Sequence, residues 1–264
     1  LDLMLKSQIL ELPSVTVVMQ AQEIIDVDAI YKAKKRLKET LFFRFESSMQ
    51  AQYLEFHDPF NSDINSLNIG KRALKNLLLS YLISSQKDDK IELALLQYQQ
   101  SVTMTDRIIA LDLLENFAPL EAEAYLNEFY EEYHSDTLVM NKYFSILAAA
   151  DREDVLDRVQ ALQNDPVYDI KVPNLVRSLI GVFARNPRHF HASTGYGYSF
   201  IADKIIELDQ INPMIASGLA GAYKSYSRLD PNHQELMGKE LKRILTTDSL
   251  SKNVLEIVEK ILKD

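Results

Sequence analysis

The sequence of 264 residues has no cysteine, few glycines and no long apolar run. Without cysteine, disulfide bonds and thiolate metal sites are excluded, and the cytoplasm is the expected compartment. Seven glycines and eight prolines are spread along the chain, so no stretch has the composition of a flexible linker. Apolar runs such as 77–84 and 145–150 are too short to span a bilayer, and no signal-peptide pattern opens the sequence. We therefore expect one continuous, soluble body.

Charge of one sign is also not concentrated anywhere. The net charge of -9 comes from 29 basic and 38 acidic residues and is spread over many segments, which argues against nucleic acid or an anionic membrane as a partner. The one basic run, 32–38, lacks interleaved aromatic residues, so we interpret it as the solvated face of a helix. The carboxylate pairs 88–89 and 131–132 are interpreted as exposed, solubilising residues.

What the sequence does have is helical periodicity in nearly every window, with no convincing alternation of period two. Apolar residues recur at spacings of three and four, which places them on one face of a helix. The clearest stripes lie in 69–82, 122–133 and 250–262, and the second is backed by glutamates. Each stripe needs a partner helix to cover it.

Helix entries are marked by a capping side chain followed by proline at Asn186-Pro187, Asn212-Pro213 and Asp230-Pro231. Further entries are predicted at Ser14, at Asp28 before a long helix over 29–56, at Thr105 or Asp106, and at Asp248 or Ser249. About a dozen helices with short connections favour one all-α domain over 1–264, built as stacked antiparallel helix pairs in an armadillo- or HEAT-like superhelical solenoid. A compact, non-repeating helical bundle is the alternative.

Catalytic chemistry is not indicated. The zinc motif HExxH is absent, because none of the five histidines is followed by glutamate. His189 and His191 lack a third ligand at a recognisable spacing, so we interpret them as loop histidines that satisfy backbone groups after a helix end. Gly195-Tyr196-Gly197-Tyr198 lacks the lysine of a phosphate-binding loop and predicts a tight turn that brings Tyr198 and Phe200 into the next helix. There is no GxSxG elbow either.

Several segments, in order, resemble the C-terminal region of the bacterial aminopeptidase N family of zinc peptidases. They cover essentially the whole chain, and the block from Arg177 to Tyr198 is the most specific. The matching segments are LPS at 12–14, IIDVDAI at 24–30, KRALKN at 71–76, MTD at 104–106, LVMNKYF at 138–144, VRSLIGVF at 176–183, NP at 186–187, FHA at 190–192 and GY at 197–198.

The resemblance implies that this chain is the non-catalytic part of a larger cytoplasmic metallopeptidase that releases N-terminal residues from short peptides. In the family, the HExxH helix and its zinc belong to an upstream catalytic domain, so this chain alone is expected to be inactive and to hold no metal. The C-terminal domain closes the active-site chamber and gates access of peptides. Its partners are therefore that catalytic domain and, in the intact enzyme, the peptide substrate. The resemblance also implies that the family's first C-terminal helices are missing from this fragment.

Two residues are candidates for lining the chamber. By resemblance, Arg177 corresponds to an arginine that can pair with a peptide carboxylate, and Met214 to a position at the rim of the pocket for the first substrate side chain. Without the resemblance, Arg177 is an ordinary helix-surface or interhelix arginine and Met214 is a core residue in a first helical turn. Gly218 departs from the family, in which an arginine stands there, and puts a second basic contact in doubt. His191 and Tyr198 match the family but are assigned to packing.

Two other functions remain open. The chain is a free-standing helical-repeat scaffold that binds a peptide or protein on its concave face, or it is an enzyme with an unrecognised site. An HExxH motif upstream of residue 1 in the parent reading frame would exclude the scaffold.

Overall fold

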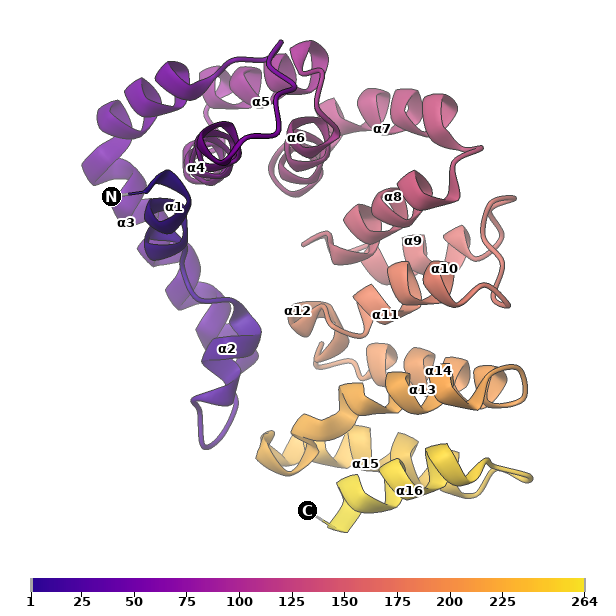
Figure 1. The fold of residues 1–264 in the computed structure, drawn as a ribbon. Helices are drawn as coiled ribbons and strands as arrows, with labels where there is room; N and C mark the ends of the chain where they lie inside the picture. The colour runs from indigo at the N-terminus through magenta and orange to yellow at the C-terminus, as the bar shows by residue number, and fades with distance from the viewer. Residues whose placement is uncertain (1, 264) are drawn as a thin grey trace. The chain divides into compact units, whose positions relative to one another are not determined.

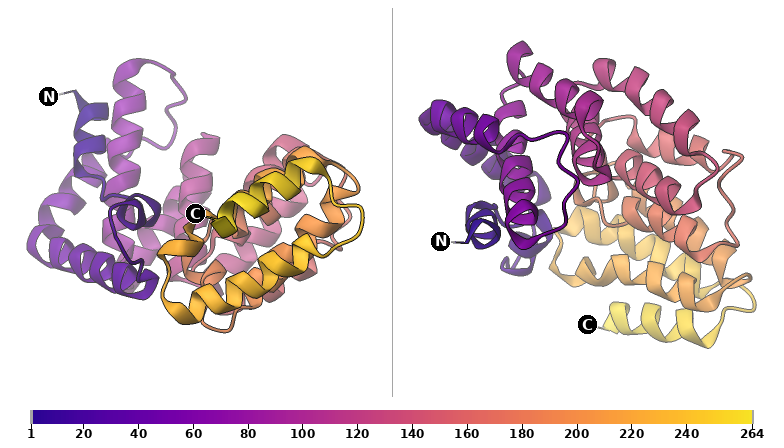
Figure 2. Two further views of the ribbon diagram at one scale, coloured as in Figure 1. Left: turned by 90° about the horizontal axis from the view of Figure 1, so that it is seen from below. Right: turned by 45° about the horizontal axis from the view of Figure 1, so that its top comes forward.

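The computed structural model describes residues 2–263, and within them all regular structure is helical apart from one isolated bridge between Ile25 and Leu229. This confirms the all-α prediction. The chain divides into two compact units, one of Leu1–Pro13 with Lys32–Glu132 and the other of Ser14–Tyr31 with Tyr133–Asp264. The organisation as a single domain stays a prediction. Figures 1 and 2 show the order of the elements along the chain.

Unit 1 contains α1 (Leu3–Leu10), most of α3 (Val27–Phe56), α4 (Ser66–Ile83), α5 (Asp88–Gln100), α6 (Met104–Phe117) and nearly all of α7 (Pro119–Tyr133). The central helix is α4, which contacts α1, α5 and α6. Its predicted stripe is buried at Leu74, Leu78 and Leu82, but Lys75, Asn76 and Leu79 are buried as well. A helix with neighbours on three sides buries more than one face, which a single stripe does not predict.

Unit 2 contains α2 (Val15–Gln20), the start of α3, and the helices from α8 onward. These are α8 (Thr137–Ala149), α9 (Val155–Leu162), α10 (Pro173–Ser178), α11 (Ile180–Phe183), α12 (Pro187–Phe190), α13 (Tyr196–Asp209), α14 (Pro213–Ala220), the 3-10 helix η1 (Gly221–Arg228), α15 (Pro231–Leu245) and α16 (Lys252–Lys263). Neighbouring helices contact each other in the series α13 with α14 and α15, and α16 with α14 and α15. The orange and yellow helices of Figure 2 show this stacking.

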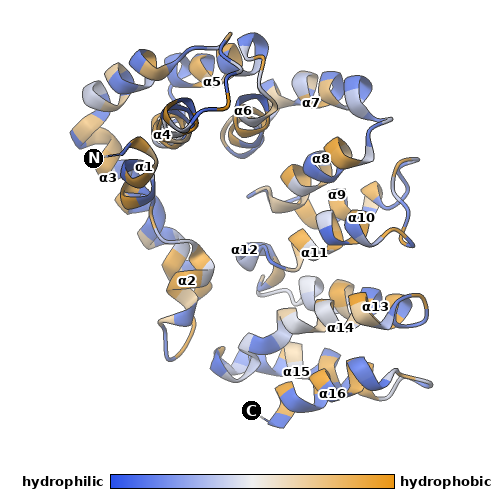
Figure 3. Cartoon of the chain, viewed as in Figure 1, coloured by the Kyte–Doolittle hydropathy of each residue, from blue (hydrophilic) through white to orange (hydrophobic). Residues whose placement is uncertain are grey.

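The apolar stripes predicted over 122–133 and 250–262 are confirmed. Ala122, Leu126 and Phe129 are buried in α7, while the backing glutamates are exposed. In α16, Val254, Val258 and Ile261 are buried. Figure 3 shows this amphipathic character, since hydrophobic and hydrophilic residues alternate along α15 and α16. Within the described range 2–263, no helix is both long enough and apolar enough to cross a membrane.

The predicted helix entries are confirmed at Asn212, Asp230 and Ser14, whose side chains accept hydrogen bonds from the first turn. Asn186 also precedes its helix, but its side chain instead donates to the carbonyl oxygens of Ala148 and Ala150, at 3.4 and 3.1 Å. Asn186 therefore marks the start of α12 correctly, while its side chain donates to carbonyl groups at the end of α8.

Three other entries were placed wrongly by two or three residues. The caps are Asp26 rather than Asp28, Thr103 rather than Thr105 or Asp106, and Ser251 rather than Asp248 or Ser249. In each case several capping residue types stand close together, and only one places its oxygen on the free N–H groups. The structure also has more helices than the dozen expected, because α2, α10, α11 and α12 are six residues long or shorter.

The segment that includes α2 joins the C-terminal part of unit 2 through one arginine. Arg228 Nη2 donates to the carbonyl oxygens of Met19 at 2.8 Å and Gln20 at 3.2 Å, and also to that of Gln22. Ile25 N donates to Arg228 O at 2.8 Å beside these contacts. Helix α2 therefore ends on a cation that satisfies its free carbonyl groups.

Candidate functional site

Arg177 lies in the last turn of α10 and is exposed. Leu175 and Val176 are buried and hold the helix in place, so the guanidinium projects from a fixed backbone. Its Nη1 donates to Asn174 Oδ1 at 3.1 Å, and no carboxylate within residues 2–263 forms an ion pair with it. The interpretation as a helix-surface arginine agrees with this exposure. An exposed guanidinium without a carboxylate partner among the described residues can also bind an external carboxylate.

Met214 is 73% exposed in the first turn of α14, so the interpretation of this residue as part of the core is wrong. The helix begins at Pro213 and is capped by Asn212, whose Oδ1 accepts from Ile215 N at 3.2 Å. Ile215 and Ala216 are buried, and they leave Met214 on the opposite, solvent-facing side. The thioether is therefore available to an apolar ligand.

Gly218 stands one turn after Met214 on the same face of α14. It is exposed, and a Cβ added there would meet nothing within 4 Å. The backbone therefore tolerates a larger residue, including the arginine that the family resemblance expects at this position. Arg177 and Met214 stand on different helices of unit 2, and what they share is solvent exposure.

The segment 190–198 packs as predicted, with a tight turn that leads into α13. Gly195 has a positive φ of 71°, which favours glycine, and Tyr198 and Phe200 are 0% and 6% exposed. A Cβ on Gly197 would lie 2.7 Å from Phe190 O and 2.9 Å from His189 O. The second glycine is therefore required by the close approach of α12, and no phosphate-binding role is needed to explain it.

His191 and Tyr198 are joined in the interior of unit 2, which confirms their assignment to packing. His191 Nδ1 lies 2.8 Å from Tyr198 Oη, and Tyr223 Oη donates to Tyr198 O at 2.5 Å. His233 completes the group, with its Nε2 2.9 Å from His191 O and its Nδ1 in contact with Asp230. Sequence reasoning missed His233 and Tyr223, because both are distant from 191–198 along the chain.

The environment keeps His191 neutral. Burial and, to a smaller extent, the nearby His233 together lower the pKa of His191 to about 4. The partner of His189 is a carboxylate: its Nε2 lies 3.2 Å from Asp151 Oδ1, and Arg188 Nη1 lies 2.6 Å from the same oxygen. Burial would raise the pKa of Asp151, but the hydrogen bonds from His189 and Arg188 outweigh it and lower the pKa.

The two histidines of His189-Phe190-His191 thus have separate partners. Both side chains bond to other side chains, so the expectation that they satisfy backbone groups is wrong. Across residues 2–263, no group of three or more histidine, aspartate or glutamate side chains is arranged to hold a metal ion. The described donor groups therefore do not fit a catalytic zinc site.

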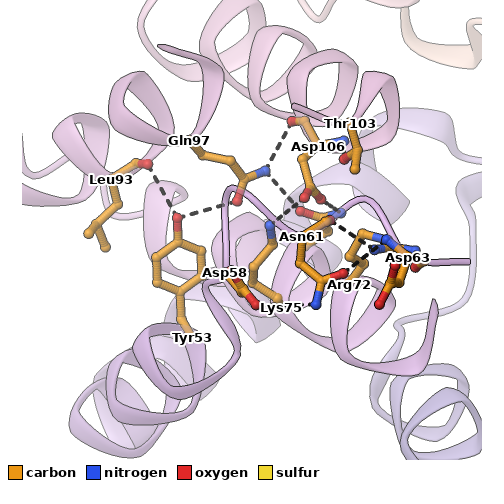
Figure 4. A network of polar contacts seen from close by, with 11 residues as sticks. Tyr53, Asp58, Asn61, Asp63, Arg72, Lys75, Leu93, Gln97, Thr103 and Asp106 are labelled. Carbon is orange, nitrogen blue, oxygen red and sulfur yellow. Dashed lines mark hydrogen bonds and ion pairs between the residues drawn. The ribbon is translucent and has the colours of Figure 1, made fainter. Parts of the chain in front are cut away.

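Unit 1 contains a buried polar network that the sequence did not reveal (Figure 4). Lys75 Nζ lies 2.8 Å from Asp106 Oδ2, and the two side chains are 1% and 2% exposed. Asn76 donates to Asp106 Oδ1 at 2.8 Å, and Gln97 donates to Asn76 Oδ1 at 2.9 Å. Tyr53 Oη lies 3.3 Å from Gln97 Oε1. The network links α3, α4, α5 and α6.

Part of the basic run over 32–38 is also not simply solvated. Lys38 Nζ lies 5.6 Å from the centre of the Tyr81 ring and 5.4 Å from that of Phe117. Burial, with a smaller contribution from Lys34, lowers the pKa of Lys38 to about 8. Lys34 Nζ donates to the carbonyl oxygen of Pro13. The interpretation of the run as a solvated face is therefore wrong for these two residues, whereas Lys32, Lys35 and Arg36 are exposed as expected.

Comparison with known proteins places these features in a family. The model of the domain of unknown function DUF3458_C, described as ARM repeats, matches residues 1–263. This confirms the prediction of stacked helix pairs of the armadillo type. Aminopeptidase N of Haemophilus influenzae is 31% identical in an alignment that covers 99% of this chain and 30% of that protein. Aminopeptidase N of Escherichia coli is 30% identical, with the same two coverages.

A third relative, aminopeptidase N of Caulobacter vibrioides, is 30% identical over 260 residues and is covered to 30%. The chain thus spans about 30% of the length of these relatives. Among solved structures, Legionella pneumophila aminopeptidase A in complex with aspartic acid matches all of this chain with a TM-score of 0.91 and 28% identity, and 32% of that protein is covered. The resemblance noted from the sequence is confirmed.

Proposed function

The chain belongs to the family of DUF3458_C ARM-repeat domains, and we propose that it is the non-catalytic C-terminal domain of a cytoplasmic zinc aminopeptidase. In this proposal it closes the active-site chamber of an upstream catalytic domain and gates the access of short peptides, from which the enzyme releases N-terminal residues. One observation carries the proposal: 99% of the chain aligns with 30% of an aminopeptidase N. The other 70% of such a protein has room for the catalytic domain.

The zinc ion belongs, in this proposal, to that catalytic domain. The described residues of this chain include no cluster of three potential metal ligands, and His189 and His191 are engaged by Asp151 and Tyr198. Zinc sites in hydrolases need three protein ligands and a bound water. This chain supplies shape and peptide contacts instead.

Arg177 and Met214 are the proposed contacts to the peptide. The guanidinium of Arg177 is exposed and has no carboxylate partner within the described residues, so it can pair with a peptide carboxylate. Met214 is 73% exposed, and its flexible thioether can adapt to different apolar side chains. Both residues stand on helices whose opposite faces are buried, so substituting them leaves the fold unchanged.

The first test is the parent reading frame. An HExxH motif with a downstream glutamate upstream of residue 1 supports the proposal. A frame that begins close to residue 1 overturns it and leaves a helical-repeat scaffold that binds a peptide or protein. The proposal also predicts that the 264-residue chain alone shows no turnover of an alanyl chromogenic substrate, with or without zinc.

The second test measures kinetics of the full enzyme over a panel of N-terminal residues. We expect Met214→Ala to change the ratio of kcat/KM between large and small N-terminal side chains, and Arg177→Ala to raise KM for peptides more than for amino-acid amides. The matched controls are Leu138→Ala, which is equally exposed at 73% in a first helical turn, and Arg36→Ala, an exposed arginine of α3. Kinetics that match the controls would return both residues to surface roles.

A further inference from the structure

A pocket of about 340 Å³ lies wholly within unit 2. One wall comes from α2 and the loop after it, through Thr16, Met19, Gln20 and Ile25. The other wall comes from the segment 184–191 and from η1. The volume falls in the range of pockets that hold small organic molecules.

The charges at this pocket are all of one sign. Arg185, Lys224 and Arg228 line it, and none of its lining residues, all of which lie in the described part of the chain, is acidic. Arg185 and Lys224 are exposed, and neither forms an ion pair or side-chain hydrogen bond with another described residue. In a protein with a net charge of -9, two unpaired cations on one pocket are a local exception. They favour an anionic ligand.

Arg228 has a different role from the other two cations. Its Nη2 is already held by the carbonyl oxygens at the end of α2, at 2.8 Å from Met19 O. It therefore fixes the wall while adding positive charge to the pocket. His191 also lines the pocket, but its neutral ring adds no charge at neutral pH.

The rest of the pocket is apolar, with one unused polar group. Met19, Ile25 and Phe190 are 8%, 3% and 1% exposed and form part of the lining. Ser225 also lines the pocket, and its Oγ is buried without a hydrogen-bond partner among the described residues. A buried hydroxyl without a partner costs free energy, which a ligand oxygen can recover. The lining thus combines two unpaired cations, a buried hydroxyl without a partner and an apolar surface.

We propose that this pocket binds a small organic carboxylate that carries one apolar side chain. Arg185 and Lys224 hold the carboxylate, Ser225 hydrogen-bonds to it, and the side chain packs against Met19 and Ile25. The proposal does not rest on the aminopeptidase function, because every residue it uses belongs to unit 2 and neither Arg177 nor Met214 takes part.

Titration calorimetry of the full protein with N-acetyl-leucine and N-acetyl-leucinamide tests this proposal. Both ligands lack a free α-amine, so an aminopeptidase does not consume them, and they differ in the carboxylate alone. We expect the acid to bind at least tenfold more tightly than the amide. Equal affinities would overturn the proposal, whatever the hydrolytic activity of the protein turns out to be.

Variants locate the binding. The double variant Arg185→Gln, Lys224→Gln should weaken binding of the acid at least tenfold and leave the far-ultraviolet circular dichroism unchanged. Lys239→Gln is the matched control, because Lys239 is an exposed lysine of α15 that does not line the pocket, and it should bind like the wild type. Acid binding that survives the double variant would place the ligand elsewhere and overturn the proposal.

Inorganic phosphate distinguishes a carboxylate pocket from a general anion site. As a competitor at the same concentration, phosphate should displace N-acetyl-leucine weakly, since it cannot use the apolar wall. If phosphate binds as tightly as N-acetyl-leucine, the apolar wall of Met19 and Ile25 does not contribute to binding, and this part of the proposal is overturned.

Discussion

Lys75 and Asp106 in unit 1 are 1% and 2% exposed and lie 2.8 Å apart, whereas Arg185 and Lys224 in unit 2 are exposed and have no ion-pair partner among the described residues. The first pair, with Asn76 and Gln97, uses its charges to hold helices of unit 1 together. The second pair contributes nothing to packing by its charge. Charges that are paired inside the protein stabilise the fold. Charges that are left unpaired at a pocket indicate a binding site for a ligand of opposite charge.

The largest expected effect comes from breaking the buried pair in unit 1. Asp106→Ala leaves the Lys75 ammonium and the Asn76 amide in the interior without their partner. Removing one member of a buried ion pair costs about 3–5 kcal/mol, so we expect a loss of unfolding free energy of that size. Urea denaturation followed by circular dichroism measures it.

The double variant Lys75→Met, Asp106→Leu is the control for this effect. With both charges gone, the desolvation cost of the lone lysine disappears, and a large part of the stability should return. The exposed pair of Lys263 and Glu259, at 3.0 Å, offers a second control, and breaking it should change the midpoint hardly at all. Equal losses at the buried and exposed pairs would contradict the distinction.

The next largest effect is on the pH dependence of the unfolding free energy, to which one buried group in each unit contributes with opposite sign. The folded-state pKa of His191 in unit 2 is lowered to about 4, so the unfolded chain binds more protons between pH 4 and 6.5. The contribution of His191 to the unfolding free energy is therefore fully present above pH 6.5. It is lost as the pH falls through 4, by about 3 kcal/mol at most. In unit 1, burial and then Glu115 raise the pKa of Asp112 to about 6. Its contribution is present at low pH and is lost as the pH rises through 6.

Two variants separate these contributions. His191→Gln should flatten the loss of unfolding free energy between pH 6.5 and 4, whereas Asp112→Asn should steepen it, because the compensating gain disappears. The measurement is a series of urea unfolding curves across this pH range. Curves for both variants that run parallel to the wild type would show that neither group titrates as its surroundings imply.

A smaller effect distinguishes two glycines of unit 2. Gly197→Ala places a methyl group 2.7 Å from Phe190 O, a backbone atom, and should cost about 1–3 kcal/mol as α12 and α13 are pushed apart. Gly218→Ala meets nothing within 4 Å and should stabilise the protein by about 0.5–1 kcal/mol, because alanine restricts the unfolded chain. Thermal melting measures both, and a stabilising Gly197→Ala would contradict the close packing.

These two glycines also show where sequence reasoning stops. Helical periodicity predicted α7 and α16, because each has one buried face and a matching pattern at spacings of three and four. The resemblance predicted the family and named Arg177 and Met214. Neither approach predicts whether a helical glycine faces a neighbouring backbone or open solvent, since that depends on how helices pack.

The polar interior of unit 1 was missed for the same reason. Lys75 and Asn76 stand among the leucines of α4, a position that hints at burial, but the partner Asp106 was assigned to a possible helix start. Pairing across 30 residues is set by the packing of α4 on α6. The pocket of unit 2 likewise joins residues around 19 and 225, a separation that no local pattern records.

The smallest expected effect on stability is at the two candidate peptide contacts. Arg177→Ala removes a side chain whose one side-chain hydrogen bond is to Asn174, and Met214→Ala removes a side chain that is 73% exposed. Surface substitutions of this kind change the unfolding free energy by less than about 0.5 kcal/mol. Urea unfolding of both variants should therefore overlay the wild type, even where their kinetics differ. A loss above 1 kcal/mol would mean that these residues stabilise the fold, as Lys75 and Asp106 do. Their side chains would then not be available for the peptide contacts proposed for them.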